Sequence, residues 1–75
     1  MRDRIIEVVA GVFGLPAETV ARGIRPDQVE GWDSERHVRL VVALEDAFDC
    51  MFEPEEVPEL ISLEGIEAAL SRHVG

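Results

Sequence analysis

Hydrophobic residues recur at the helical spacing of about 3.6 residues in three separate stretches of this chain. The first stretch, residues 3–13, carries its apolar side chains at Ile5, Ile6, Val8, Val9, Val12 and Phe13. Gly14 and Pro16 follow it, and both residue types favour the end of a helix. The sequence contains neither the alternating pattern of a strand nor the turn signal of a hairpin, so the predicted elements are helices.

The second stretch begins at Asp33 or Ser34, either of which can cap a helix, and it runs to about Asp49. The third stretch follows Ser62, a further cap residue, and runs to about His73. Its inward-facing residues are expected to be Leu63, Ile66, Ala69 and Leu70.

Two connections join these helices. Residues 14–33 contain glycine, proline and scattered apolar residues, and they predict a long ordered loop with a short turn near residues 17–22. Residues 50–62 predict one short helical turn at 55–60, because Pro58 is unfavourable inside a longer helix. The 75 residues therefore predict one all-α domain. We expect a small bundle of three main helices plus a short fourth helix, with a long loop between the first and second main helices.

The second main helix carries two apolar stripes. Leu40, Leu44 and Phe48 form the heavier one, which is expected to face the core. Val38 and Val42 form a narrower stripe that lies nearer to Ser34, because the helix advances by about 100° per residue. The second stripe is either the edge of a wide buried face or a small exposed patch beside the serine. In the latter case it would be flanked by Glu35, Arg39, Glu45 and Asp46, and an apolar patch with a charged rim is typical of a docking surface.

Composition narrows the class of protein. The net charge of −9 argues against a nucleic-acid partner and favours basic protein partners. The one cysteine, Cys50, cannot form an internal disulfide, and no group of residues has the spacing of a metal site. No apolar stretch approaches the length of a membrane span, so a cytoplasmic protein is expected.

The candidate chemistry is centred on Ser34, at the start of a helix, where backbone N–H groups favour a phosphate. His37 could share a helix face with Ser34, but the sequence indicates no third residue that would orient it as a catalytic base. A chain this small also has little room for an enzyme cleft, so no enzymatic activity is expected. We expect His37 to face solvent, Cys50 to be partly buried, and the glutamates at 53, 55, 56 and 59 to form a solvated acidic surface.

The segment Gly31-Trp32-Asp33-Ser34, followed by Leu40-Val41, Leu44-Glu45 and Phe48, resembles the acyl carrier protein family. The resemblance covers nearly the whole chain. It implies that Ser34 is esterified by 4′-phosphopantetheine from coenzyme A, installed by a phosphopantetheinyl transferase that recognises the position of Asp33. It also implies that the arm's thiol holds acyl groups as thioesters for partner enzymes, and that the protein is a monomer.

The chain departs from that family directly after the serine. Glu35 replaces the usual leucine, and Arg36 and Arg39 stand where acidic residues are typical. These changes predict a specialised carrier of a natural-product or short-chain acyl pathway. Its expected docking residues are Glu35, Arg36, Val38, Arg39, Val42, Glu45 and Asp46. The alternatives are a peptidyl or aminoacyl carrier, whose usual Gly-Gly-x-Ser signature is missing, and an unmodified acidic interaction module in which Ser34 is only a helix cap.

Overall fold

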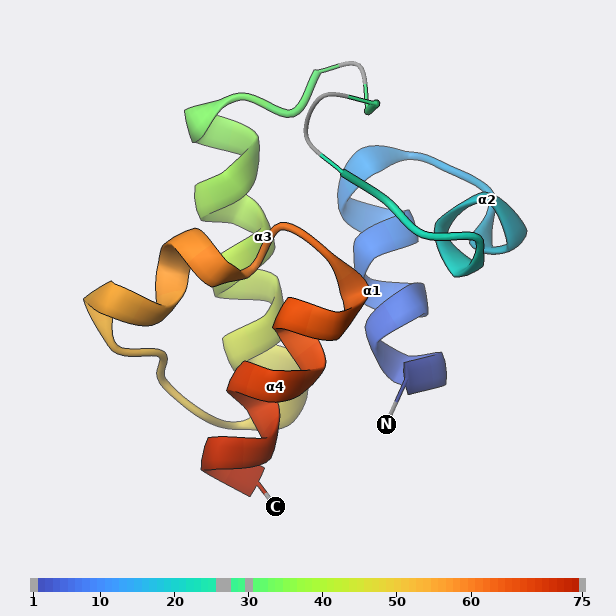
Figure 1. Ribbon diagram of the computed structural model, residues 1–75. Coiled ribbons are helices and arrows are strands. Elements are labelled where there is room, and N and C mark those ends of the chain that lie inside the picture. Colours follow the sequence, from blue (N-terminus) through green and yellow to red (C-terminus); the bar gives the residue numbers. More distant parts are fainter. Residues whose placement is uncertain (1, 26–27, 30, 75) are drawn as a thin grey trace.

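The computed structural model describes residues 2–25, 28–29 and 31–74 of the chain. It confirms the prediction of a small all-α bundle, and the described residues form no strand. The elements are α1 (Arg2–Phe13), α2 (Ala17–Ala21), α3 (Ser34–Phe48), the 3₁₀ helix η1 (Pro54–Glu59) and α4 (Leu63–Val74) (Figure 1).

Local sequence explains where the longer helices stop. Gly14 follows α1 with a φ of 66°, a left-handed conformation that glycine adopts without strain. Asp49 ends α3 in the same region, with a φ of 52°, and Cys50 N–H donates to the carbonyl of Glu45 across the end of the helix. At the other end of the connector, Ser62 accepts a hydrogen bond from Gly65 N–H and caps α4 as predicted.

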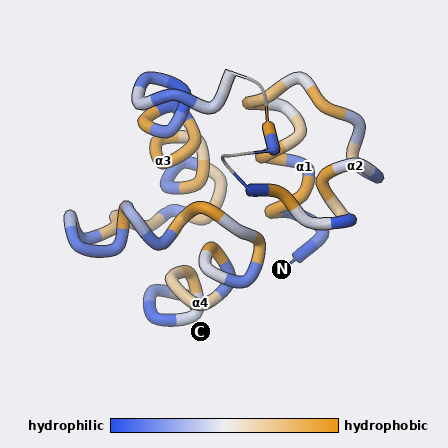
Figure 2. Tube along the Cα trace, turned by 45° about the horizontal axis from the view of Figure 1, so that its top comes forward, coloured by the Kyte–Doolittle hydropathy of each residue, from blue (hydrophilic) through white to orange (hydrophobic). Residues whose placement is uncertain are grey.

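The core lies where α1 packs against α3, α2 and α4. Its members are the apolar positions of the helical patterns together with two residues of the long loop region and two of the η1 connector: Ile5, Val9, Val20, Ile24, Leu40, Leu44, Phe52, Leu60, Leu63, Ile66, Ala69 and Leu70. Figure 2 shows hydrophobic segments on α1, α3 and α4, whereas most of η1 is hydrophilic. The four residues predicted to face inward from the last helix are all buried.

Figure 1 shows residues 31–33 leading into the start of α3 at one end of the bundle. Val20, in α2, and Ile24, just after α2, are both buried in the core and anchor that part of the chain. Ser34 lies at the surface, at the start of a helix whose opposite face is packed.

The predicted acidic surface of the connector is correct for Glu53, Glu55 and Glu59, which are exposed, but wrong for Glu56. Glu56 is only 4% exposed, because its carboxylate is enclosed by hydrogen-bond donors. Glu53 N–H donates to Glu56 Oε1 at 2.7 Å, and His73 Nε2 donates to the same oxygen at 2.7 Å. These two bonds hold the pKa of Glu56 below its ordinary value, and the bond from His73 also fastens η1 to α4.

No helix in the described part of the chain is long and apolar enough to cross a membrane.

Candidate functional site

Asp33, not Ser34, is the N-cap of α3. Its backbone is extended, and its Oδ1 accepts the N–H of Arg36 at 2.8 Å. Ser34 is the first helical residue and is exposed, and within the described part of the chain no hydrogen bond engages its hydroxyl. The helix start is therefore capped without the serine, which leaves Ser34 Oγ available to a reagent from outside.

The second apolar stripe of α3 is exposed, so the interpretation of one wide buried face is wrong. Val38 is 60% and Val42 is 57% exposed. Five of the seven expected docking residues lie on this side of α3, and all are exposed: Glu35, Val38, Arg39, Val42 and Asp46. Arg39 and Glu35 form an ion pair at 3.1 Å, so the surface near the serine presents both signs of charge.

The other two expected docking residues are engaged within the protein. Arg36 is half-buried, and its guanidinium donates to the carbonyl of Val12 at 2.7 Å, at the end of α1. Glu45 is half-buried and accepts the N–H of Phe52 at 2.8 Å, which holds the start of the connector against α3. Both side chains therefore support the fold around the exposed face.

His37 does not face solvent, which corrects the expectation from sequence. It is half-buried between Trp32 and η1: Trp32 Nε1–H donates to His37 Nδ1 at 3.1 Å, and His37 Nε2 lies 2.9 Å from the carbonyl oxygen of Val57. The rings of Trp32 and His37 are stacked, with centroids 6.0 Å apart. The spacing of His37 from Leu40 and Leu44, three and seven residues, was the signal that it lies on the core side of α3.

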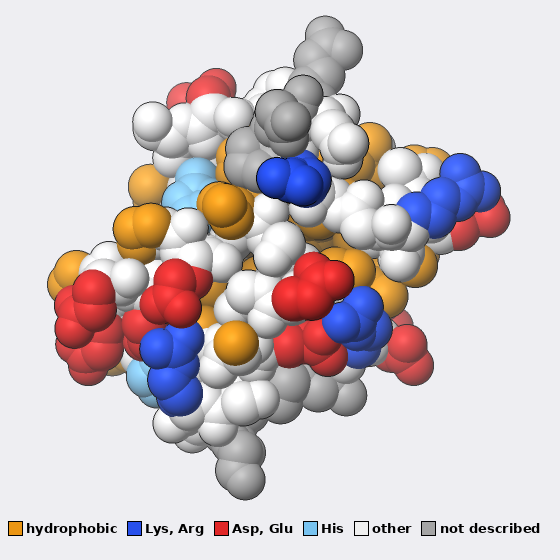
Figure 3. Space-filling model, in the orientation of Figure 1, with side chains coloured by type: hydrophobic (Ala, Val, Ile, Leu, Met, Phe, Trp, Pro, Cys, Tyr) orange, Lys and Arg blue, Asp and Glu red, His pale blue; other side chains and the backbone are white. Residues whose placement is uncertain are grey.

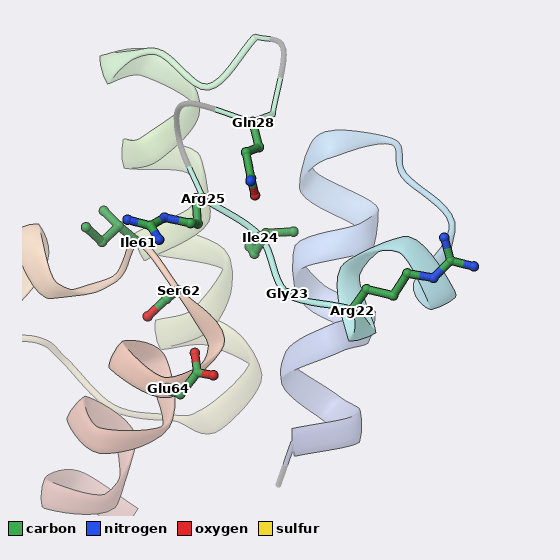
Figure 4. A pocket seen from close by; sticks show the side chains of 8 residues that line it. All are labelled: Arg22, Gly23, Ile24, Arg25, Gln28, Ile61, Ser62 and Glu64. Atoms are coloured by element: carbon green, nitrogen blue, oxygen red, sulfur yellow. The ribbon is translucent and has the colours of Figure 1, made fainter.

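A groove runs beside Ser34. It is lined by Trp32, Asp33, Ser34, His37, Val38 and Ile61, so residues from the loop, from α3 and from the connection between η1 and α4 form its walls. A second cavity, of about 490 Å³, is also lined by Ile61. It lies between the segment after α2 and the start of α4 (Figure 4).

The lining of the second cavity is mixed, with polar side chains beside Ile24 and Ile61. Gln28 and Arg25 come from the loop, and Ser62 and Glu64 come from the start of α4. In Figure 4 the Arg25 side chain extends toward Ile61, while the Arg22 side chain points away from the other lining residues. The two hollows thus share Ile61, a side chain that is 44% exposed.

Acidic side chains gather over η1, on the left of the molecule in Figure 3. Among the described residues, no group of three or more histidine, cysteine, aspartate or glutamate side chains is arranged to hold a metal ion. Cys50 is half-buried, as expected from the sequence. Partial burial, followed by the negative charge of Glu45, raises the pKa of its thiol, so Cys50 lacks the environment of a reactive cysteine.

Comparison of the whole sequence with models of protein families found no match, and comparison with curated protein sequences found no match either.

Proposed function

We propose that this protein is an acyl carrier whose Ser34 bears a 4′-phosphopantetheine arm. The observation that carries the proposal is made at the start of α3, where Asp33 caps the helix. Ser34 is exposed, and its hydroxyl makes no hydrogen bond within the described residues. A serine retained only as a cap would be expected to make the capping bond itself. The sequence resemblance to acyl carrier proteins supplies the identity of the arm.

The residues around Ser34 fit such a group. A phosphodiester on Ser34 Oγ would lie at the N-terminal end of a 15-residue helix, where the backbone dipole favours negative charge. Ser34 Oγ would form the new P–O bond as 3′,5′-ADP leaves coenzyme A, and the transferase would accept the hydroxyl proton. The groove past Ile61 offers a path for the arm along the surface.

The bound arm supplies a thiol that holds acyl groups as thioesters, and the chain's own residues present them. Val38 and Val42 give a partner enzyme an apolar contact, while Glu35, Arg39 and Asp46 surround it with charge. Arg39 would repel the basic patch of an enzyme that recognises an acidic helix. We therefore propose a specialised, monomeric, cytoplasmic carrier that works with dedicated acyl-loading and acyl-processing enzymes of a natural-product or short-chain acyl pathway.

The decisive experiment is incubation of the protein with coenzyme A and a broad-specificity phosphopantetheinyl transferase, followed by intact-mass measurement. The mass should rise by one phosphopantetheinyl group. Ser34→Ala should stay unmodified, and Ser71→Ala, which removes another exposed serine, should be modified as the wild type is. Because Asp33 provides the cap, Ser34→Ala should keep its circular dichroism spectrum. An unchanged wild-type mass would favour the unmodified interaction module.

A second experiment tests the specialised role. Binding of the modified protein to a ketosynthase of ordinary fatty-acid synthesis should be weak, and Arg39→Glu should strengthen it. Equal affinity of the wild type and a typical fatty-acid carrier for that enzyme would contradict the proposal. Thioester formation with an aminoacyl-adenylating enzyme, in place of an acyl-loading enzyme, would instead indicate the aminoacyl carrier.

A further inference from the structure

His37 lies between a donor and an acceptor, and this arrangement determines its protonation. The indole N–H of Trp32 can only donate, so His37 Nδ1 must be free of a proton to accept it. The carbonyl of Val57 can only accept, so His37 Nε2 must carry the proton. The geometry therefore requires the neutral imidazole with its proton on Nε2, and both of its nitrogens are satisfied.

This bridge connects three parts of the protein at the end where Ser34 lies. Trp32 belongs to the loop before α3 and also packs on Phe13 at the end of α1, with ring centroids 4.7 Å apart. Val57 lies in η1, while His37 belongs to the first turn of α3. Trp32 and His37 also line the groove beside Ser34. The imidazole thus links α3 to the loop through one ring nitrogen and to η1 through the other.

We propose that His37 is a positioning residue for the modification of Ser34, acting through Trp32 and Val57. The inference rests on the proposed function. Without the imidazole, Trp32 and Val57 would both lose their hydrogen bond to α3. The walls of the groove beside Ser34 would then be held less firmly for the transferase.

Other charges near the bridge are already occupied or exposed. On α3, Asp33 caps the helix, Arg36 bonds to Val12 and Arg39 pairs with Glu35. Among the carboxylates on or beside η1, Glu56 and Glu59 pair with residues of α4. Glu53 and Glu55 are exposed to solvent. From the loop, Arg25 approaches Ile61 in the neighbouring cavity (Figure 4). Both hydrogen bonds described for His37 are to uncharged groups, the indole of Trp32 and the carbonyl of Val57.

The kinetic test compares the wild type with His37→Ala and His37→Gln as substrates of one transferase. A single hydrogen bond shifts an equilibrium by a factor of roughly five, so His37→Ala should lose about five- to thirtyfold in kcat/KM at pH 8. Glutamine can still donate one N–H, and His37→Gln should recover part of the loss. Equal kcat/KM values for His37→Ala and the wild type would overturn the inference, as would a His37→Gln variant that recovers none of the loss.

Two measurements need no transferase, so they separate this inference from the proposed function. ¹⁵N NMR at pH 8 should show His37 as the neutral tautomer protonated on Nε2; the opposite tautomer would refute the bridge. Amide hydrogen exchange at pH 7 should be faster in His37→Ala than in the wild type for η1 and the first turn of α3. Unchanged exchange would refute the positioning role even if Ser34 is modified. Failure of the wild type to be modified, with these two results as expected, would refute the carrier function and with it the role of His37 in modification.

Discussion

Replacing Gly65 by alanine should destabilise the protein, although a glycine-to-alanine change at an exposed helix position usually stabilises a protein. A Cβ at Gly65 would lie 2.1 Å from the carbonyl oxygen of Glu59 and 3.2 Å from Ser62 Oγ. The first distance is about 0.9 Å shorter than the closest approach that real Cβ atoms make. The obstructing atom belongs to the backbone at the end of η1, so no rotamer change can move it away.

The magnitude follows from two opposing terms. Alanine favours a helix over glycine by up to about 1 kcal/mol. Displacing the packed backbone of η1 costs roughly 1–3 kcal/mol or more, as for other overpacked sites. With so short an approach we expect the second term to win, giving a net loss of about 1–2 kcal/mol. In a domain of this size that loss lowers Tm by roughly 4–16 °C.

The chain offers a matched control in Gly11, which lies in α1 and is exposed, with no atom within 4 Å of an added Cβ. Gly11→Ala should raise stability by about 0.4–1 kcal/mol. Urea unfolding of both variants, followed by circular dichroism and by the fluorescence of the one tryptophan, measures the two changes. If Gly65→Ala is as stable as Gly11→Ala, the close contact between η1 and α4 is not as described, and the reasoning fails.

Three further predictions concern single side chains. Glu56→Gln should make the free energy of unfolding depend less on pH in the acid range. Because the pKa of Glu56 is lowered in the folded protein, its contribution to stability is present above the pKa of the unfolded chain and is lost as the pH falls through the folded value. Urea unfolding at several pH values would show the difference. Leu44→Ala should destabilise the fold by about 2–5 kcal/mol, whereas Val42→Ala, two residues earlier on the exposed stripe, should change it by less than about 0.5 kcal/mol; equal effects in thermal unfolding would contradict the assignment of the two faces. Cys50 should react with iodoacetamide at neutral pH more slowly in the folded protein than in urea, because its pKa is raised, and a faster reaction when folded would argue against this environment.

The helices could be predicted because their signals are local. The apolar period located α1, α3 and α4, and the cap residues Asp33 and Ser62 placed the starts of the last two. The connector helix begins one residue earlier than expected, at Pro54, since proline is well suited to the first position of a helix. The exposed stripe of Val38 and Val42 was one of two open interpretations, and only the packing of α3 decided between them.

The environments of Glu56 and His37 could not be predicted in the same way. Each depends on partners distant in the sequence: Glu56 meets His73, which is 17 residues away, and His37 meets Val57, which is 20 residues away. A pattern along the chain reports which face of a helix is apolar, but it does not report which polar groups the folded backbone brings to that face. For that reason the position of Ser34 at the start of a helix could be predicted. The hydrogen bonds of His37 to Trp32 and Val57 were found only in the structure.

The two faces of α3 can evolve almost independently. Substitutions at Val38, Arg39 and Val42 alter what another protein meets, and each is expected to leave the packing of Leu40 and Leu44 intact. Under the proposed function, an engineer could therefore redirect the domain toward a different partner by changing one helical stripe, without redesigning the interior. By the same reasoning, a lineage of such domains could change partners repeatedly while keeping one core.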